Sequence, residues 1–149
     1  MRIVGKSILL RQVEREDLAS IHDMSTSYND ISGYFTTYVR ARSYWVKRFE
    51  QTGLWDDSYG MLVICDKDSA AILGIIYYFK HSYVVGYEIS VTILKQNVRG
   101  KNIITEAVRI FSAYLFCTYS IPRIQFNTLV DITKNKDHLK YASDIGYTY

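Results

Sequence analysis

The sequence predicts an α/β or α+β fold, in which helices pack on a mixed, mostly antiparallel sheet. Three observations lead to this prediction. Three runs rich in Ile, Val and Tyr follow one another between positions 60 and 94 and are separated by short polar turns, as in an antiparallel meander. The stretch 103–119 then has the apolar spacing of a helix, and the alternating segment 123–130 predicts a strand after a crossover.

The first part of the chain predicts a strand followed by a helix. Apolar residues are dense in Ser7–Val13, as in a short strand, and they recur every three residues in Asp17–Met24, as on one face of a helix. The next segment, 25–37, contains small, polar and aromatic residues with Gly33 at its middle. We therefore expect a loop or a broken helix there.

A second helix is expected to begin at Ser43, whose side chain can cap the first turn. Trp45 and Phe49 lie four residues apart, so they share one face of this helix. Gly53 is expected to end it, because glycine adopts the left-handed conformation of a helix C-terminus most easily.

Three strands and a buried helix follow. The strands are expected at Gly60–Cys65, Ile72–Phe79 and Val84–Leu94. The helix over Ile103–Tyr119 is expected to be mostly buried, because its apolar residues widen beyond a single stripe. A further strand is expected at Arg123–Val130, where apolar and polar residues alternate.

The last part predicts one more helix and the start of a strand. The helix is expected over Lys136–Ile145, between Asn135 as its cap and Gly146 as its C-terminal stop. Tyr147–Tyr149 would begin another strand, at which the sequence ends.

Length and composition fit one globular domain over residues 1–149. The hydrophobic content of 48% with 22% charged residues is that of an ordinary folded protein. The longest apolar stretches are too short to span a bilayer. The segment Met1–Gly5 does not fit a secretory signal, so a cytoplasmic location is expected.

Cysteine, histidine and charge exclude several classes of site. Cys65 and Cys117 form no closely spaced pair, so we expect two buried thiols rather than a disulfide or a zinc site. The histidines are isolated from one another, and no metal is expected. The net charge of +3 is spread along the chain, so nucleic acid is not an expected partner.

The segment 95–102 is the part of the chain best suited to bind an anion. It joins an expected strand to an expected helix, whose first N–H groups and partial positive charge attract phosphates. Gly100 allows close approach of the backbone, and Arg99 and Lys101 add charge. Asn102 tolerates a left-handed conformation and is a good helix cap. The same segment could instead be a surface turn that caps a core helix.

Four segments of the sequence carry a resemblance to a known family. They are the RGKN turn followed by ITEAV, the later segments FNTLV and NKDHLKYASDIGY, and the opening ILLRQVEREDLASI. Together they resemble the GNAT superfamily of N-acetyltransferases, in particular its RimJ/RimL-type branch. In the order given, they resemble the family's loop and helix start, its next strand, the segment after that strand, and its first strand and helix. The resemblance covers most of the chain apart from 25–37.

This resemblance implies that acetyl-CoA binds in a cleft of a splayed sheet. The pantetheine arm would pair with the strand backbone near Thr92, Ile93 and Leu94, like an added strand. Asn135 matches a family asparagine near the pantetheine, although it could be only a helix cap. The pyrophosphate would bind main-chain N–H groups of the loop and helix start, which are those of Val98, Arg99, Gly100, Lys101, Asn102 and Ile103.

Acetyl transfer to an amine requires a proton acceptor and a proton donor. Glu88 resembles the glutamate of the family's E-I-G pattern and is the candidate base, with a solvent-facing strand residue as the alternative. Main-chain N–H groups near Ile93 or Leu94 would stabilise the oxyanion. Tyr141 or Tyr147 could be the acid, and each could instead be a core residue.

The sequence also departs from the family pattern. Asn102 stands where Gly or Ala is usual, and Ala142 stands where many members have a tyrosine. The family's final strand is expected to be missing from this sequence, and the resulting edge could be covered by a longer chain, by a partner chain such as a second copy in a homodimer, or by a swapped segment. The expected function is acetyl transfer to a protein N-terminus, an amino sugar or a small amine, and the alternative is an inactive CoA-binding or interaction domain.

Overall fold

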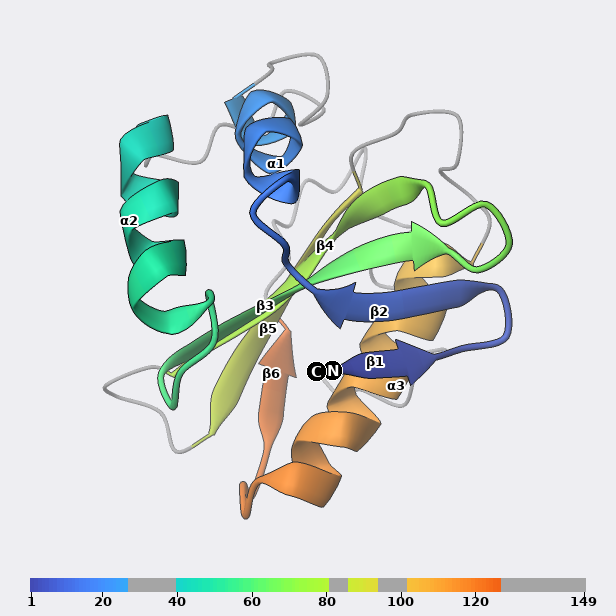
Figure 1. Cartoon of the computed structure of the whole chain (residues 1–149). Helices are drawn as coiled ribbons and strands as arrows, with labels where there is room; N and C mark the ends of the chain where they lie inside the picture. The colour runs from blue at the N-terminus through green and yellow to red at the C-terminus, as the bar shows by residue number, and fades with distance from the viewer. Residues whose placement is uncertain (27–39, 81–85, 94–101, 127–149) are drawn as a thin grey trace, which may run out of the picture.

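The computed structural model describes residues 1–26, 40–80, 86–93 and 102–126. Within these residues six strands form one sheet whose order follows the chain, β1-β2-β3-β4-β5-β6 (Figure 1). The strands are β1 Arg2–Val4, β2 Ile8–Gln12, β3 Tyr59–Asp66, β4 Ile72–Lys80, β5 Tyr87–Ile93 and β6 Ile124–Phe126, and the helices are α1 Asp17–Thr26, α2 Arg42–Thr52 and α3 Ile103–Thr118.

Neighbouring strands are antiparallel from β1 to β5, and β6 is parallel to β5. The parallel pair requires a crossover, which α3 provides. The antiparallel meander and the strand after the crossover are therefore confirmed. Strand β1 was not expected from the sequence.

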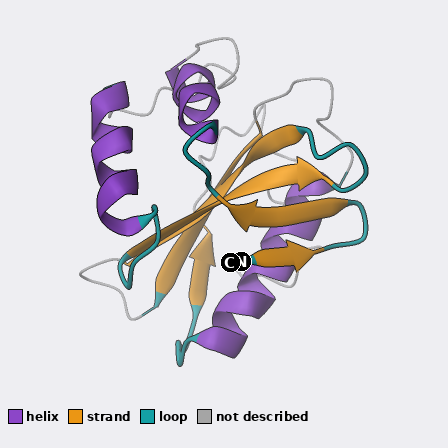
Figure 2. Ribbon diagram, in the orientation of Figure 1, coloured by secondary structure: helices purple, strands orange, loops and turns teal. Residues whose placement is uncertain are grey.

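Helices cover both faces of the sheet. Figure 2 shows α1 and α2 on one side and α3 on the other. The core is divided accordingly. On the α3 side it includes Tyr78, Ile89 and Phe111, and on the side of α1 and α2 it includes Ile21, Val63 and Ile75.

Helix α1 begins at Asp17, which is held by a partly buried ion pair. Arg11 of β2 donates to both carboxylate oxygens of Asp17, at 2.7 and 3.0 Å. The main-chain N–H of Glu14 also donates to Asp17. Burial by itself would raise the pKa of Asp17, but the bonds from Arg11 and Glu14 lower it overall. The helix expected after the first strand is confirmed.

Helix α2 corrects one expectation and confirms another. Its N-terminal cap is Ala41 in extended conformation, without a side-chain cap bond, so Ser43 lies inside the helix and does not cap it. A cation–π contact helps to hold this end, because the guanidinium carbon of Arg40 lies 4.8 Å from the ring centre of Tyr44. Gly53 ends the helix with φ 63° and ψ 21°, as expected.

Helix α3 packs its apolar stripe against the sheet. Val108, Phe111 and Leu115 are fully buried, as the spacing predicts. The expectation of two buried thiols is correct for Cys65 and wrong for Cys117, which is exposed. Cys117 follows the last buried turn of α3, where the helix no longer faces the sheet, and its neighbour Phe116 is exposed as well.

An aromatic cluster joins the end of α3 to the turn before β3. Tyr78 of β4 is fully buried and donates from its hydroxyl to the main-chain oxygen of Asp56, at 2.5 Å. The Trp55 indole N–H donates to the Tyr119 hydroxyl at 3.3 Å, and the Trp55 ring meets Tyr78 edge to face. These contacts fix the turn at residues 55–58.

Several expected elements lie outside the described residues. They are the loop beyond residue 26, the strand segment 127–130, the helix 136–145 and the strand 147–149.

Candidate active site

Glu88 is a buried carboxylate at the parallel junction of β5 and β6. It is directly opposite Phe79 of β4 on one side and Gln125 of β6 on the other. Glu88 is only 8% exposed, which excludes the alternative of a solvent-facing strand residue. Carboxylates are seldom buried to this extent, so Glu88 is the described side chain best suited to accept a proton in a site.

The alternation of β5 places Glu88 on the face of α1 and α2. Neighbouring side chains of a strand point to opposite faces. Tyr87, Ile89 and Ile93 belong to the core on the α3 side, and Val91 packs against it. The alternate positions of the strand therefore face α1 and α2, and they are polar: Glu88, Ser90 and Thr92.

A row of paired residues crosses four strands through Glu88. Tyr59 of β3 is opposite Phe79, Phe79 is opposite Glu88, and Glu88 is opposite Gln125. Adjacent strands are about 4.8 Å apart, so Tyr59 and Glu88 lie about 10 Å from each other in this row. The Tyr77 ring stacks on the rings of both Tyr59 and Phe79, with centroid distances of 6.0 and 6.3 Å. An aromatic surface thus leads to the carboxylate.

The described pairing of β6 with β5 covers only the first residues of β5. The register ends with Ile89 opposite Phe126. No described residue pairs with the segment Ser90–Ile93 on that side, although Ile93 and Thr92 are paired with β4 on the other. Main-chain groups at such an edge can hydrogen-bond an extended ligand.

The start of α3 presents main-chain donors. Asn102 precedes the helix in the left-handed conformation, with φ 54° and ψ 12°, and its side chain makes no cap bond. The left-handed conformation agrees with the expectation for Asn102, and the capping role is not observed. Ile103 is the first helical residue, as expected, and its side chain is buried in the core. Only the main chain of Ile103 can therefore serve a ligand, since the first N–H groups of a helix have no partner within it.

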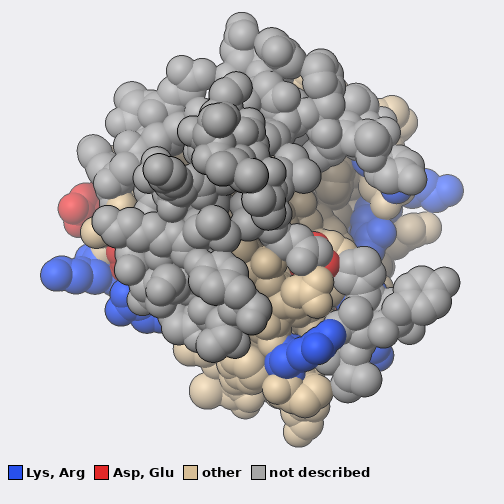
Figure 3. Space-filling view, turned by 180° about the vertical axis from the view of Figure 1, so that it is seen from behind, with Lys and Arg blue, Asp and Glu red and all other residues tan. Residues whose placement is uncertain are grey.

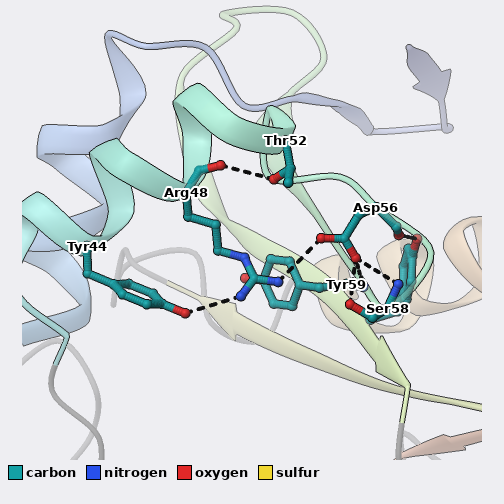
Figure 4. Close-up of polar contacts among 7 residues, drawn as sticks. Tyr44, Arg48, Thr52, Asp56, Ser58 and Tyr59 are labelled. Carbon is teal, nitrogen blue, oxygen red and sulfur yellow. Dashed lines mark hydrogen bonds and ion pairs between the residues drawn. The ribbon is translucent and has the colours of Figure 1, made fainter.

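A polar network lies at the other end of the row, around Arg48 of α2 (Figure 4). The Arg48 guanidinium carbon is 4.5 Å from the ring centre of Tyr59. Its two terminal nitrogens contact the Tyr44 hydroxyl at 3.2 Å and the Asp56 carboxylate at 3.6 Å. Within the described part of the chain, Arg48 Nε is buried without a hydrogen-bond partner.

Asp56 and Tyr59 have fixed ionisation states near neutral pH. The side-chain bond from the Ser58 hydroxyl, together with the N–H groups of Ser58 and Tyr59, holds the pKa of Asp56 below its ordinary value. Burial raises the pKa of the Tyr59 phenol well above its usual range. Near neutral pH, Asp56 is therefore an anion beside Arg48, and Tyr59 is a neutral aromatic surface.

The structure describes some of the expected site residues and not others. Glu88, Ile93, Asn102 and Ile103 are described, and the side chain of Ile93 is buried in the core. The remaining expected site residues lie outside the described ranges, and they are Leu94, Val98, Arg99, Gly100, Lys101, Asn135 and Tyr141.

Sequence reasoning did not identify Arg48. The spacing of four between Tyr44 and Arg48 is a local signal for a side-chain pair on a helix. The contacts of Arg48 with Asp56 and Tyr59, however, depend on how α2 packs on the sheet, which no local pattern reveals.

Further features of the described ranges concern metal ligands, membrane spans and surface charge. They contain no group of three or more metal-ligating side chains of the type His, Cys, Asp or Glu. None of their helices is long and apolar enough to cross a membrane. On the face opposite to that of Figure 1, the described Lys and Arg side chains are scattered rather than gathered in one patch (Figure 3).

Comparison with solved structures identifies the fold. RimL, the ribosomal L7/L12 alpha-N-protein acetyltransferase in complex with coenzyme A, superposes with a TM-score of 0.78 at 13% identity, covering 99% of this chain and 84% of RimL. Spermidine N-acetyltransferase from Vibrio cholerae, in complex with CoA and spermine, superposes with a TM-score of 0.75 at 18% identity, covering 94% of this chain and 80% of that enzyme.

A GNAT-family acetyltransferase from Bacillus anthracis is also similar, with a TM-score of 0.75 at 17% identity and coverage of 98% of this chain and 82% of that protein. No curated protein sequence is matched. The family model for the acetyltransferase (GNAT) domain matches residues 7–146. With its mixed sheet and a match over nearly its whole length, the chain belongs to the GNAT acetyltransferase family.

Proposed function

We propose that this chain is a RimJ/RimL-type N-acetyltransferase, a single domain over residues 1–149 that transfers the acetyl group of acetyl-CoA to a primary amine. The observation that carries the proposal is the position of Glu88, which is a buried carboxylate at the parallel junction of β5 and β6. The family match supports the class of reaction, and the CoA complexes of two structural neighbours support the donor.

We assign the parts of coenzyme A to the end of β5 and the start of α3. No described residue pairs with Ser90–Ile93 on the β6 side, so this segment could pair with a pantetheine chain, and we assign main-chain pairing to Ile93 and Leu94. The start of α3 has the main-chain donors that a diphosphate needs, and no Asn102 side chain occupies them. We assign the diphosphate to 98–103, with Arg99 and Lys101 as charged partners, and we assign Asn135 to the pantetheine.

Glu88 would prepare the acceptor amine. An ammonium group has no lone pair, so a proton must leave before the nitrogen can attack. The Glu88 carboxylate would accept that proton, directly or through one water molecule. When bound, acetyl-CoA supplies an acetyl group activated as a thioester.

Two further groups would assist the transfer. A main-chain N–H near Ile93 or Leu94 would donate to the carbonyl oxygen as negative charge develops on it. Tyr141, or alternatively Tyr147, would give a proton to the leaving sulfur. Ala142 stands where many family members have a tyrosine, which is why a neighbouring tyrosine is assigned to this step.

The acceptor is a protein N-terminus, an amino sugar or a small amine. The stacked rings of Tyr59, Tyr77 and Phe79 lead toward Glu88 and suit an acceptor with an apolar or flat part next to its amine. One structural neighbour is named for spermidine and another for a ribosomal protein, so the fold itself accommodates both small and macromolecular acceptors.

A second candidate function is a CoA-binding domain without turnover. It is favoured by Ala142 in place of the family tyrosine and by Asn102 in place of Gly or Ala. Such a domain would bind acetyl-CoA but release no thiol with any amine.

The test combines calorimetry with a screen for thiol release. We expect the chain to bind acetyl-CoA and to release free thiol with at least one amine among N-terminal peptides, amino sugars and polyamines. Glu88→Gln should retain the affinity for acetyl-CoA and lower kcat at neutral pH by about 10²-fold or more. Glu50→Gln makes the same chemical change at an exposed carboxylate of α2 and should leave kcat unchanged.

Each outcome separates the candidates. Binding without thiol release from any amine would favour the inactive domain. No heat with acetyl-CoA or CoA would exclude both candidates. Equal kcat values for Glu88→Gln and the wild type would remove Glu88 from the reaction.

A further inference from the structure

Glu106, in the first turn of α3, reaches across to the turn between β1 and β2. Its carboxylate accepts hydrogen bonds from the main-chain N–H of Lys6 and from the hydroxyl of Ser7. The Ser7 main-chain N–H lies 3.0 Å from Oε1 and 3.4 Å from Oε2 of the same carboxylate. Both oxygens are thus engaged by residues about a hundred positions earlier in the chain.

The turn is built closely around this carboxylate. Gly5 donates from its N–H to the main-chain oxygen of Ile8 at 2.8 Å, which closes the turn. A Cβ atom at Gly5 would lie 2.2 Å from Glu106 Oε1 and 3.1 Å from that Ile8 oxygen. A side chain at position 5 would therefore displace the carboxylate or open the turn.

The contact between Glu106 and the β1–β2 turn fixes the position of the start of α3, which apolar packing alone does not determine. Ile103 and Ala107 bury apolar side chains under the start of α3, but apolar packing has little directional preference. Hydrogen bonds to a charged acceptor are directional and stronger than neutral ones. The turn of residues 5–8 thereby sets the position of the first turn of α3 and of the main chain at Asn102 and Ile103.

The contact also governs the charge next to the proposed diphosphate site. A carboxylate in the first turn of a helix is favourable for the helix dipole, but it repels a nearby anion. Here burial alone would raise the pKa of Glu106, and the bonds from Ser7 and Lys6 lower it overall. The negative charge is therefore permanent near neutral pH and is neutralised in part by donors of the β1–β2 turn.

We propose that Glu106 is a positioning residue for acetyl-CoA, which acts through the β1–β2 turn by holding the main-chain donors at Asn102 and Ile103 in the geometry that binds the diphosphate. The inference rests on the proposed function, since it requires that the start of α3 receives the cofactor. Glu106 itself touches neither acetyl-CoA nor the acceptor in this proposal.

The test compares binding constants and the separate kinetic constants of wild type with those of variants at Glu106. Glu106→Ala should weaken acetyl-CoA binding about tenfold and raise its KM equally, while kcat and the KM for the amine stay within about twofold. Glu106→Gln keeps an oxygen acceptor for the turn and should stay within about threefold of wild type. Arg109→Ala, at an exposed site on the same helix, is the control and should bind normally.

Gly5→Ala disrupts the contact between Glu106 and the β1–β2 turn by a change in the turn instead of in the helix. It should weaken acetyl-CoA binding to a similar extent as Glu106→Ala, because its Cβ displaces the carboxylate. In the double variant Gly5→Ala/Glu106→Ala, the second substitution should add less than about twofold, since the clashing oxygen is gone.

The outcomes are distinct from those that test the function. If wild type binds no acetyl-CoA, the proposed function fails and the inference fails with it. If wild type binds and Glu106→Ala binds equally well, only the inference fails. Tighter binding by both Glu106→Ala and Glu106→Gln would mean that the charge, not the position, matters. Should Glu106→Ala not fold, Gly5→Ala and Ser7→Ala, which removes one donor, give the same comparison.

Discussion

The guanidinium of Arg48 lies over the ring of Tyr59, at 4.5 Å from its centre, while one of its nitrogens contacts Asp56 at 3.6 Å. The contact of Arg48 with Asp56 joins α2 to the turn before β3. Tyr59 begins the row of paired residues that leads through Phe79 to Glu88. The position of α2 over the aromatic surface is therefore coupled to the strands of the candidate site.

Replacing Arg48 by Ala should destabilise the fold measurably. A cation–π contact and a partly exposed ion pair are together worth about 1–2 kcal/mol, which corresponds to about 2–8 °C in melting temperature for a domain of this size. Thermal unfolding followed by circular dichroism would measure it. Arg15→Ala, which breaks the exposed Arg15–Glu50 pair, should change the melting temperature much less. Equal effects of the two substitutions would contradict the prediction.

The hydroxyl of Tyr78 should contribute more to stability than that of Tyr77. Tyr78→Phe removes the donor to the Asp56 main-chain oxygen and leaves a partly buried acceptor without this partner, at a cost of about 1–2 kcal/mol. Tyr77 is the matched control, because its ring packs in the stack but its hydroxyl makes no hydrogen bond among the described residues. Urea unfolding of Tyr78→Phe and Tyr77→Phe gives the loss in free energy of unfolding for each variant. A larger loss in Tyr77→Phe than in Tyr78→Phe would show that the hydrogen bond of Tyr78 is unimportant.

Stability should fall in acid partly through Glu106. Its pKa is lowered in the folded state from an ordinary value of 4.5, so the folded state binds its proton less readily than the unfolded state does. The contribution is complete above pH 4.5 and is lost as the pH falls through the folded-state pKa. Urea unfolding between pH 7 and pH 3 should therefore show a shallower acid decline for Glu106→Gln than for wild type. Parallel profiles would exclude this linkage.

The two thiols should react at very different rates. Cys117 is exposed, whereas Cys65 has no exposed surface and burial raises the pKa of its thiol. Thiolates are the reactive form, so a maleimide at neutral pH should label Cys117 first. Mass spectrometry of digested protein would locate the label, and Cys117→Ser should remove the fast phase. Fast labelling of Cys65 in that variant would mean that the sheet opens readily.

Local signals predicted the parts of the fold that depend on local chemistry. Gly53 ends α2 in the left-handed conformation that glycine favours, and Asn102 adopts the same conformation before α3. Alternation identified β5 but left its face uncertain by one residue. The structure resolves this point, because the core positions Tyr87 and Ile89 place Glu88 on the opposite face.

Features that depend on contacts between residues far apart in the sequence were not predicted. Strand β1 has three residues, too few for a period to be seen, and it is defined only by its pairing with β2. Ser43 has the right chemistry for a cap, but the helix already begins at Arg42. The contact of Glu106 with Ser7 spans 99 positions, and the one between Arg48 and Asp56 requires the packing of α2 on the sheet.

The order of the sheet has a consequence for how the chain folds. The pairs β1–β2, β3–β4 and β4–β5 join strands that follow each other closely in the chain, so they need only short loop closures, which are fast. The pairing of β2 with β3 must span α1 and α2, and the pairing of β5 with β6 must span the 16-residue helix α3. The contact of Glu106 with Lys6 closes a loop of about a hundred residues. Contacts between distant parts of the sequence thus meet at α3, beside the proposed cofactor site, and such contacts are expected to form slowly.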